Sequence, residues 1–233
     1  MKLLNIENAK TVKGESLGYL TGVLYLAPAE ESGVMNTCPM ASEGCKAGCL
    51  YTAGRASFDP HIIAARIRRT RQLAKDRKSF LNDLRSDIRA IIRKASRENL
   101  IPAVRLNGTS DLFWLVATLA REFPEVQFYD YTKLPKPWLR EMANYHLTFS
   151  LSENNWQDAE KALAHGFNVA VPFDVKRGQP LPAMWRGRTV IDGDQHDLRF
   201  LDGHQGSIIG LRAKGQAKKD VSGFVQIAAL AAA

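Results

Sequence analysis

Short apolar segments recur along the second half of the chain at intervals that indicate a repeating unit. They cover residues 102–108, 126–131, 146–152, 168–173, 188–194 and 207–213, and an earlier segment of the same kind covers residues 19–26. Each segment has the length and the β-branched or aromatic content of a buried strand. The pattern therefore predicts six to seven strands.

Helical patterns separate the first four of the later segments. They lie at residues 111–122, 137–144 and 155–164, and Gly166 follows the last one as a C-cap. Strands and helices that alternate at this spacing are typical of βαβ units in a parallel sheet. A Gly- and Pro-rich segment replaces the expected helix between residues 173 and 189. We therefore expect an α/β fold of mostly parallel strands, a partial or distorted βα TIM-type barrel, with residues 1–233 in a single domain.

Residues 60–98 predict two basic amphipathic helices that are interrupted near Ser79. Asp59 has the position of an N-cap, and Pro60 that of the first helical residue. The apolar positions at helical spacing are Ile67, Leu73, Leu81, Leu84, Ile88, Ile91 and Ile92. The chain carries a net charge of +8, and many of its basic residues lie here. We favour a solvated helix face over a nucleic-acid-binding stripe, because few aromatic residues are interleaved.

The three cysteines of the chain, Cys38, Cys45 and Cys49, all lie in one loop of small and polar residues at 36–55. Three thiolates on a short loop suit a metal site, and Gly44 and Gly48 would let the backbone bend toward a common centre. The alternatives without a metal are one disulfide with a spare thiol, or three independent small apolar side chains.

The number of ligands bears on the kind of metal. Structural zinc requires four protein ligands, and the nearest additional histidine or cysteine is His61, well beyond the loop. A [4Fe–4S] cluster held by three cysteines leaves one iron open for water, substrate or cofactor. We therefore expect a cluster in preference to zinc.

Polar residues follow most of the predicted strands. In parallel βα folds the chemistry lies at the carboxyl ends of the strands, which also face the cysteine loop if the sheet is parallel. Residues 107–111 also have the composition of a helix N-cap, and a polar residue after a strand often belongs to a simple turn. The candidate pocket residues are Asn107, Asp111, Asp130, Lys133, Ser152, Asp192 and Arg212.

A strand, a loop with three cysteines and a series of βα units together resemble the radical S-adenosylmethionine (SAM) superfamily. In that superfamily the loop after the first strand holds a three-cysteine [4Fe–4S] cluster, and SAM binds the fourth iron. Residues 22–55, with DLRFLD at 197–202 and GLRAKG at 210–215, are more closely similar to phage proteins called gene product eighty-eight domains. This resemblance implies a phage or prophage origin, action in the host cytoplasm, and ligand roles for Cys38, Cys45 and Cys49.

The chain departs from the superfamily pattern in two places. Six and then three residues separate the cysteines, a wider spacing than in the superfamily, and Asn107-Gly108-Thr109 stands where a Gly-Gly-Glu element would hold the methionine amino group. SAM is thus one candidate ligand of the open iron, and another small molecule is the alternative.

Two classes of function are compatible with these observations. In the first, the protein is a redox or radical enzyme that takes electrons from a donor. In the second, it is a non-enzymatic cluster protein that serves as an electron carrier, a sensor or a structural unit. A zinc-containing nucleic-acid-binding protein is a third alternative. The chain has no apolar run of membrane-spanning length and no apolar signal core at residues 1–10, so we expect a cytoplasmic protein without membrane contact.

Overall fold

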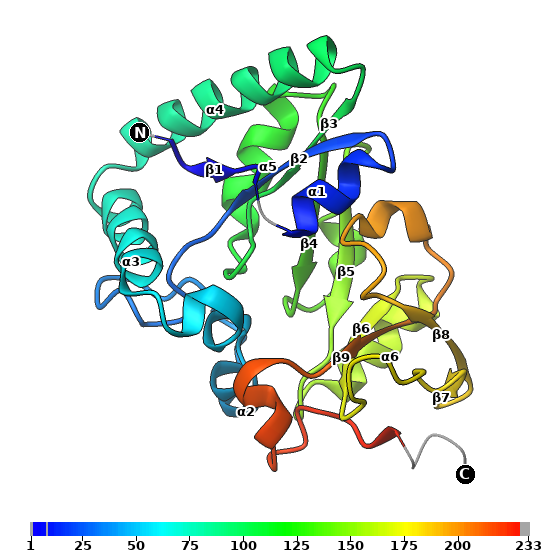
Figure 1. Cartoon of the computed structure of the whole chain (residues 1–233). Coiled ribbons are helices and arrows are strands. Elements are labelled where there is room, and N and C mark those ends of the chain that lie inside the picture. Colours follow the sequence, from blue (N-terminus) through cyan, green and yellow to red (C-terminus); the bar gives the residue numbers. More distant parts are fainter. Residues whose placement is uncertain (1, 8, 229–233) are drawn as a thin grey trace.

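The computed structural model describes residues 2–7 and 9–228, and it is built around one nine-stranded sheet (Figure 1). The strands are β1 (Leu4–Asn5), β2 (Tyr19–Leu24), β3 (Ile101–Arg105), β4 (Gln127–Thr132), β5 (Tyr145–Ser150), β6 (Val169–Phe173), β7 (Met184–Trp185), β8 (Arg188–Asp192) and β9 (Ile208–Arg212). Their spatial order is β1-β2-β3-β4-β5-β6-β9-β8-β7. The strands from β2 to β6 therefore lie side by side in the order in which the chain makes them.

The sheet is mostly parallel and does not close on itself. β2 to β6, β9 and β8 pair in parallel, whereas the short edge strands β1 and β7 pair antiparallel with β2 and β8. All seven predicted strands are present, and the mainly parallel arrangement is confirmed. The predicted total of six to seven strands is too low. β1 and β7 have only two residues each, and two residues are too few to show the alternation of apolar and polar positions that predicts a strand.

Six α-helices and five 3₁₀ turns connect the strands in the described residues. The helices are α1 (Ala9–Glu15), α2 (Glu43–Ala47), α3 (Pro60–Lys75), α4 (Arg77–Arg97), α5 (Phe113–Glu122) and α6 (Trp156–Ala164). The 3₁₀ turns are η1 (Leu50–Thr52), η2 (Gly54–Ser57), η3 (Pro137–Leu139), η4 (Arg199–Asp202) and η5 (Gly215–Lys219).

The helix predicted over residues 137–144 is wrong, because only η3 forms there. The chain leaves η3 and turns back on itself before β5: Tyr145 N–H donates to the carbonyl oxygen of Met142 at 2.9 Å, and the two residues form an antiparallel bridge. A backbone that turns in this way cannot continue the i to i−4 hydrogen bonds of a helix.

The two basic helices α3 and α4 form as predicted, and Figure 1 shows them along the top and the left side of the molecule. Asp59 caps α3 by accepting a hydrogen bond from the backbone of His61 at 2.9 Å. The break lies at Asp76, three residues before the predicted position, and its side chain caps α4 by accepting from Ser79 N–H at 2.9 Å. The buried face of α4 consists of Phe80, Leu84, Ile88, Ile91 and Ala95.

Both faces of the sheet are covered. Val104 and Phe128 join the main core with the apolar faces of α4, α5 and α6. Their neighbours Ala103 and Tyr129 point to the other face, as the alternation along a strand requires, and pack with Leu198 beside η4. The segment that carries η4 therefore covers one face of the sheet, and the helices cover the other.

None of the helices in the described part of the chain combines the length and the apolar character that a membrane span requires.

Candidate metal and cofactor site

A cavity of about 340 Å³ lies at the carboxyl ends of the parallel strands. Its walls include Arg105, Thr132, Ser150 and Arg212, each the last residue of its strand. The same cavity is lined by Cys38, Cys45 and Cys49. The structure thus places the cysteine loop over the strand ends, where the sequence predicts it.

The cysteine loop is held by hydrogen bonds at each of its three cysteines. Cys38 N–H donates to Asn36 Oδ1 at 2.7 Å, and the Cys38 thiol lies 3.6 Å from the carbonyl oxygen of Thr109. Cys45 lies in α2, and its N–H donates to the N-cap Ser42 at 3.2 Å. The Cys49 sulfur accepts from the backbone N–H of Tyr51 at 3.5 Å. The loop is therefore an ordered structure with defined sulfur positions.

Gly44 and Gly48 serve close packing, where the sequence predicted a bend. A Cβ atom at Gly44 would lie 2.1 Å from Ser222 Oγ and 2.8 Å from Phe224 Cβ, and one at Gly48 would lie 3.1 Å from Ala217 Cβ. Gly48 itself has φ −86°, which any residue adopts. The absence of side chains at these glycines lets residues 215–226 lie directly on the cysteine loop.

The cysteines are free thiols of intermediate exposure. Burial raises the pKa of the Cys38 thiol to about 11, and it also raises the pKa of Cys49. Both groups are therefore protonated near neutral pH unless a metal displaces the proton. One disulfide with a spare thiol, an alternative that the sequence left open, is not formed.

The spacing of the sulfurs distinguishes the kinds of metal that these residues fit. Tetrahedral zinc with Zn–S bonds of ~2.3 Å requires sulfurs ~3.8 Å apart. The three Sγ atoms do not all lie within 4.8 Å of one another, since the His and Glu group described below is the one such cluster among the described residues. In an iron–sulfur cluster each thiolate binds a different iron atom, so the sulfurs stand further apart. The sulfur positions therefore do not match one zinc ion bound by all three cysteines.

A family model described as Gene product 88 matches residues 1–227. The chain belongs to the gene product 88 family. This confirms the closer of the two resemblances predicted from the sequence. A search of curated proteins found no match, and a search of solved structures found none. The likeness to the radical SAM superfamily therefore stays a prediction.

Four of the candidate pocket residues of this gene product 88 domain line the cavity: Asn107, Asp111, Lys133 and Arg212. Asp111 is not an N-cap, because its carboxylate accepts from Thr132 Oγ1 at 2.9 Å and from Lys133 N–H at 2.8 Å on the next strand. Burial raises the pKa of this carboxyl group. Asn107 supports the turn before α5, since its Oδ1 accepts from Leu112 N–H at 2.9 Å.

The cations of the cavity differ in how they are paired. Arg212 Nη1 lies 3.0 Å from Asp192 and 3.1 Å from Asp194, so two carboxylates hold it. Lys133 Nζ instead donates to the neutral Ser150 hydroxyl at 3.0 Å. Lys133 is therefore better placed than Arg212 to receive an anionic group of a ligand.

Three candidate residues do not line the cavity. Asp130 lies behind Asn107 and accepts from its backbone N–H at 2.9 Å, and burial raises the pKa of Asp130 to about 7. Ser152 is buried and donates to Asn154 Oδ1 at 3.0 Å. The carboxylate of Asp192 accepts from Arg212 Nη1 and from Asp194 N–H, each at 3.0 Å.

Sequence reasoning missed Arg105, which lines the cavity and is buried. Its Nη1 lies 2.7 Å from Asp197 Oδ2, and its guanidinium lies 4.8 Å from the ring centre of Tyr131. One signal was present in the sequence: an arginine inside an apolar strand requires a buried partner. That signal does not identify the partner residue, and it does not show that Arg105 lines a cavity.

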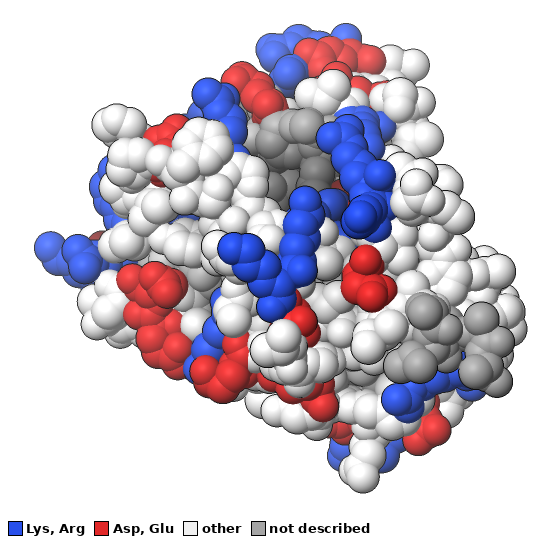
Figure 2. All heavy atoms as spheres, turned by 60° about the horizontal axis from the view of Figure 1, so that its bottom comes forward, with Lys and Arg blue, Asp and Glu red and all other residues white. Residues whose placement is uncertain are grey.

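Arginines of the basic helices find partners within the molecule. Arg85 forms a two-pronged ion pair with Glu122 at 2.6 and 2.7 Å, and the guanidinium of Arg77 lies 3.4 Å from the ring centre of Trp114. Figure 2 turns forward the bottom of Figure 1, away from α4, and there basic and acidic side chains are interspersed. The solvated and packed helix face is thus supported, and nucleic-acid contact stays a prediction.

Proposed function

We propose that this gene product 88 domain binds a [4Fe–4S] cluster through Cys38, Cys45 and Cys49, and that its sheet is a partial TIM-type barrel of the radical SAM kind. The observation that carries this proposal is the position of all three cysteines on one cavity at the carboxyl ends of parallel strands. The sequential order of β2 to β6 agrees with a βα barrel that is incomplete on one side.

The bound cluster would supply one-electron transfer and an open iron position. The chain's own groups would set its electrostatic environment. Tyr51 N–H donates to the Cys49 sulfur, and the cations Arg66 and Lys133 are close enough to favour the Cys49 thiolate. Hydrogen bonds and positive charge at the sulfurs raise the reduction potential of such a site.

The cavity favours an enzyme over a simple electron carrier. An electron carrier needs only an exposed cluster edge, whereas a cavity of about 340 Å³ lined by Lys133, Asp111 and Asn107 has the size of a small-molecule pocket. Lys133 would bind a carboxylate, and Asp111 an amino group. SAM carries both groups, as do other amino acid derivatives, and either kind of ligand fits this proposal.

Gly108 keeps the backbone of residues 107–109 close to β2. A Cβ atom there would lie 2.7 Å from the carbonyl oxygen of Leu24, so another side chain would push this turn away from the strand. The turn would therefore hold residues 107–109 beside the ligand where the superfamily uses a Gly-Gly-Glu element. We also propose that an electron donor reduces the cluster. On the basis of the family, the protein would act in the cytoplasm of a phage host.

The experiment is anaerobic purification from iron-supplied cells, followed by iron and sulfide analysis and EPR of the dithionite-reduced protein with and without SAM. We expect about four irons and four sulfides per chain. Replacing Cys38, Cys45 or Cys49 singly by serine should lower the iron content, and the exposed Ala47→Ser in the same loop should not.

Each result has a distinct consequence. A reduced signal that SAM alters would support the radical enzyme, and an unaltered signal would support cluster chemistry on another ligand or a carrier role. Zinc in place of iron, or iron that survives all three serine variants, would overturn the proposal.

A further inference from the structure

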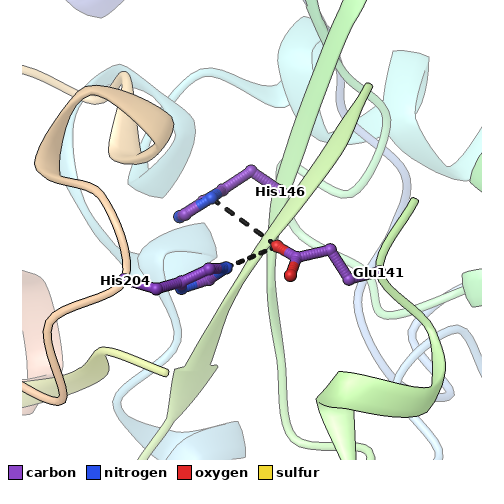
Figure 3. Close-up of side chains that lie close together, drawn as sticks. All are labelled: Glu141, His146 and His204. Carbon is purple, nitrogen blue, oxygen red and sulfur yellow. Dashed lines mark hydrogen bonds and ion pairs between the residues drawn. The ribbon is translucent and has the colours of Figure 1, made fainter. Parts of the chain in front are cut away.

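Three potential metal ligands converge at the other end of the sheet. Glu141 follows η3, His146 is the second residue of β5, and His204 lies in the loop between η4 and β9. Figure 3 shows the carboxylate and the two imidazoles turned toward one another from these separate segments. Ser150, at the far end of the same strand β5, lines the cysteine cavity. The group therefore lies at the amino end of the strands, away from the proposed cluster.

The distances within this group suit a single ion. One ligand atom from each residue lies within 4.8 Å of the other two. Glu141 Oε1 is 2.6 Å from His204 Nε2 and 3.7 Å from His146 Nδ1. Nitrogen and oxygen ligands at ~2.0–2.2 Å from tetrahedral zinc lie roughly 3.3–3.6 Å apart. The two imidazole rings stack with 4.3 Å between their centres and 16° between their planes, so they would rotate apart for both ring nitrogens to face one ion.

The ring of His146 stacks on that of His204, but its two nitrogens have no hydrogen-bond partner at an adequate distance among the described residues. Its side chain is nine-tenths buried, its Nε2 has no hydrogen-bond partner among the described residues, and 3.7 Å from Nδ1 to Glu141 is too long for a hydrogen bond. A buried polar ring left in this state costs free energy. A metal ion bound by Nδ1 would give that nitrogen the partner that Glu141 does not provide, and it would leave Nε2 as it is.

The loop that carries His204 is fixed on both sides of that residue. The buried side chain of Asn168 donates to the Gly203 carbonyl oxygen at 2.6 Å, and its Oδ1 accepts from Gln205 N–H at 3.2 Å. The His204 ring also packs against Phe167, with 4.2 Å between ring centres. An exposed histidine is thus held in place over the other two ligands, as a preorganised site requires.

We propose that Glu141, His146 and His204 bind a divalent transition-metal ion, with zinc as the best match to two imidazoles and one carboxylate. Solvent reaches the site at the exposed His204, so water supplies the remaining ligand. The ion would join the start of β5 to the loop before β9, and its role would be to stabilise this end of the fold. The competing arrangement is a metal-free ion pair between Glu141 and His204.

The test uses the full chain purified anaerobically and freed of loosely bound metal. Co²⁺ is added as a spectroscopic substitute for Zn²⁺, and the thermal midpoint is measured with and without Zn²⁺. The variants His204→Gln and Glu141→Gln each remove one ligand. His61→Gln is the matched control, because His61 is exposed on α3 and outside the group.

In the difference spectrum produced by adding Co²⁺, we expect about one Co²⁺ per chain with ligand-field bands and no new thiolate charge-transfer band, because the ligands are nitrogen and oxygen. The affinity should fall at least ~10-fold in both ligand variants and stay unchanged in the control. Zn²⁺ should raise the thermal midpoint of the wild type and the control only. Iron and sulfide contents should be the same in all four proteins, which separates this site from the proposed cluster.

Two outcomes would overturn the proposal. The first is the absence of Co²⁺ binding in a wild type with normal circular dichroism. The second is a thiolate charge-transfer band together with affinity that both ligand variants retain, which would assign the metal to the cysteines.

Discussion

The carboxylate of Glu153 caps the helix of the cysteine loop: its Oε1 accepts a hydrogen bond from Gly44 N–H at 2.8 Å. Its second oxygen accepts from Ser42 Oγ at 2.6 Å, and Ser42 is the N-cap of α2. Glu153 follows β5, more than one hundred residues along the chain from this loop. One negative charge from the strand ends thus fixes the start of the helix that carries Cys45, where the helix dipole favours it.

Replacing Glu153 by alanine should loosen the cysteine loop. The variant leaves the Gly44 amide and the Ser42 hydroxyl without a charged acceptor, which should destabilise the protein by about 1–3 kcal/mol. Urea denaturation measures that loss, and iron retained after desalting measures the effect on the proposed cluster.

Two further variants test whether the capping contact is responsible. Glu153→Gln keeps an amide oxygen for Gly44 N–H and should recover part of the stability. Glu160→Ala, on the exposed side of α6, should change little. Equal losses in Glu153→Ala and Glu160→Ala would contradict the role given to Glu153.

The contact between Gly44 and the C-terminal segment gives a second prediction. In Gly44→Ala the new methyl group meets Ser222 Oγ and Phe224 Cβ, so we expect a loss of about 1–3 kcal/mol from overpacking. Adding Ser222→Ala should restore part of it. The control is Glu43→Ala in the same helix, where the side chain is exposed. If Gly44→Ala is as stable as this control, residues 215–226 do not press on the loop as described.

The strand pattern of this chain could be predicted because it depends on local composition. Residues 169–173, for example, form a continuous apolar run, and that run is β6. The capping of α3 by Asp59 was equally local. The grouping of the three cysteines could also be predicted, because they lie within twelve residues of one another in the sequence. In the structure all three line one cavity.

Contacts between distant segments could not be predicted in this way. Arg105 and Asp197 are 92 residues apart, and Glu141 and His204 are 63 apart. Nothing near either member of such a pair identifies the other, because the pairing depends on which strand ends and loops meet in the folded sheet. For the same reason the sequence placed Asp130 in the pocket, although its side chain turns behind Asn107.

The raised pKa of Asp130 leads us to predict that the stability of the protein depends on pH. Burial raises the pKa of this carboxyl group from 3.8 to about 7 in the folded protein, while Arg105 gives its closest ion pair to Asp197. Between these two pKa values the folded state binds more protons than the unfolded state, so the free energy of unfolding falls as the pH rises. The fall attributable to Asp130 should be about 2 kcal/mol between pH ~5 and ~7.

Asp130→Asn should remove this contribution, because an amide does not ionise. The stability of the variant relative to the wild type should therefore increase with pH, as measured by urea denaturation at several pH values. Asp158→Asn, a partly exposed aspartate on α6, is the control. Parallel pH profiles for the wild type and Asp130→Asn would show that Asp130 is ionised throughout.

Lys133 gives the prediction that bears most directly on the proposed ligand. Its ammonium group lines the cavity and is held by the neutral Ser150 hydroxyl, so it can bind a carboxylate without first breaking an ion pair. Lys133→Met keeps the aliphatic stem and removes the charge. A lost charged hydrogen bond of about 1.5–3 kcal/mol corresponds to roughly a 10- to 150-fold weaker affinity for SAM, measured as the SAM concentration that half-alters the reduced EPR signal. Iron content should stay at the wild-type level, because Lys133 is not a ligand of the cluster.

Lys161→Met, exposed on α6, is the matched control. A SAM response that Lys133→Met leaves unchanged would place the carboxylate elsewhere, whereas a loss of iron would give Lys133 a role in holding the cluster loop.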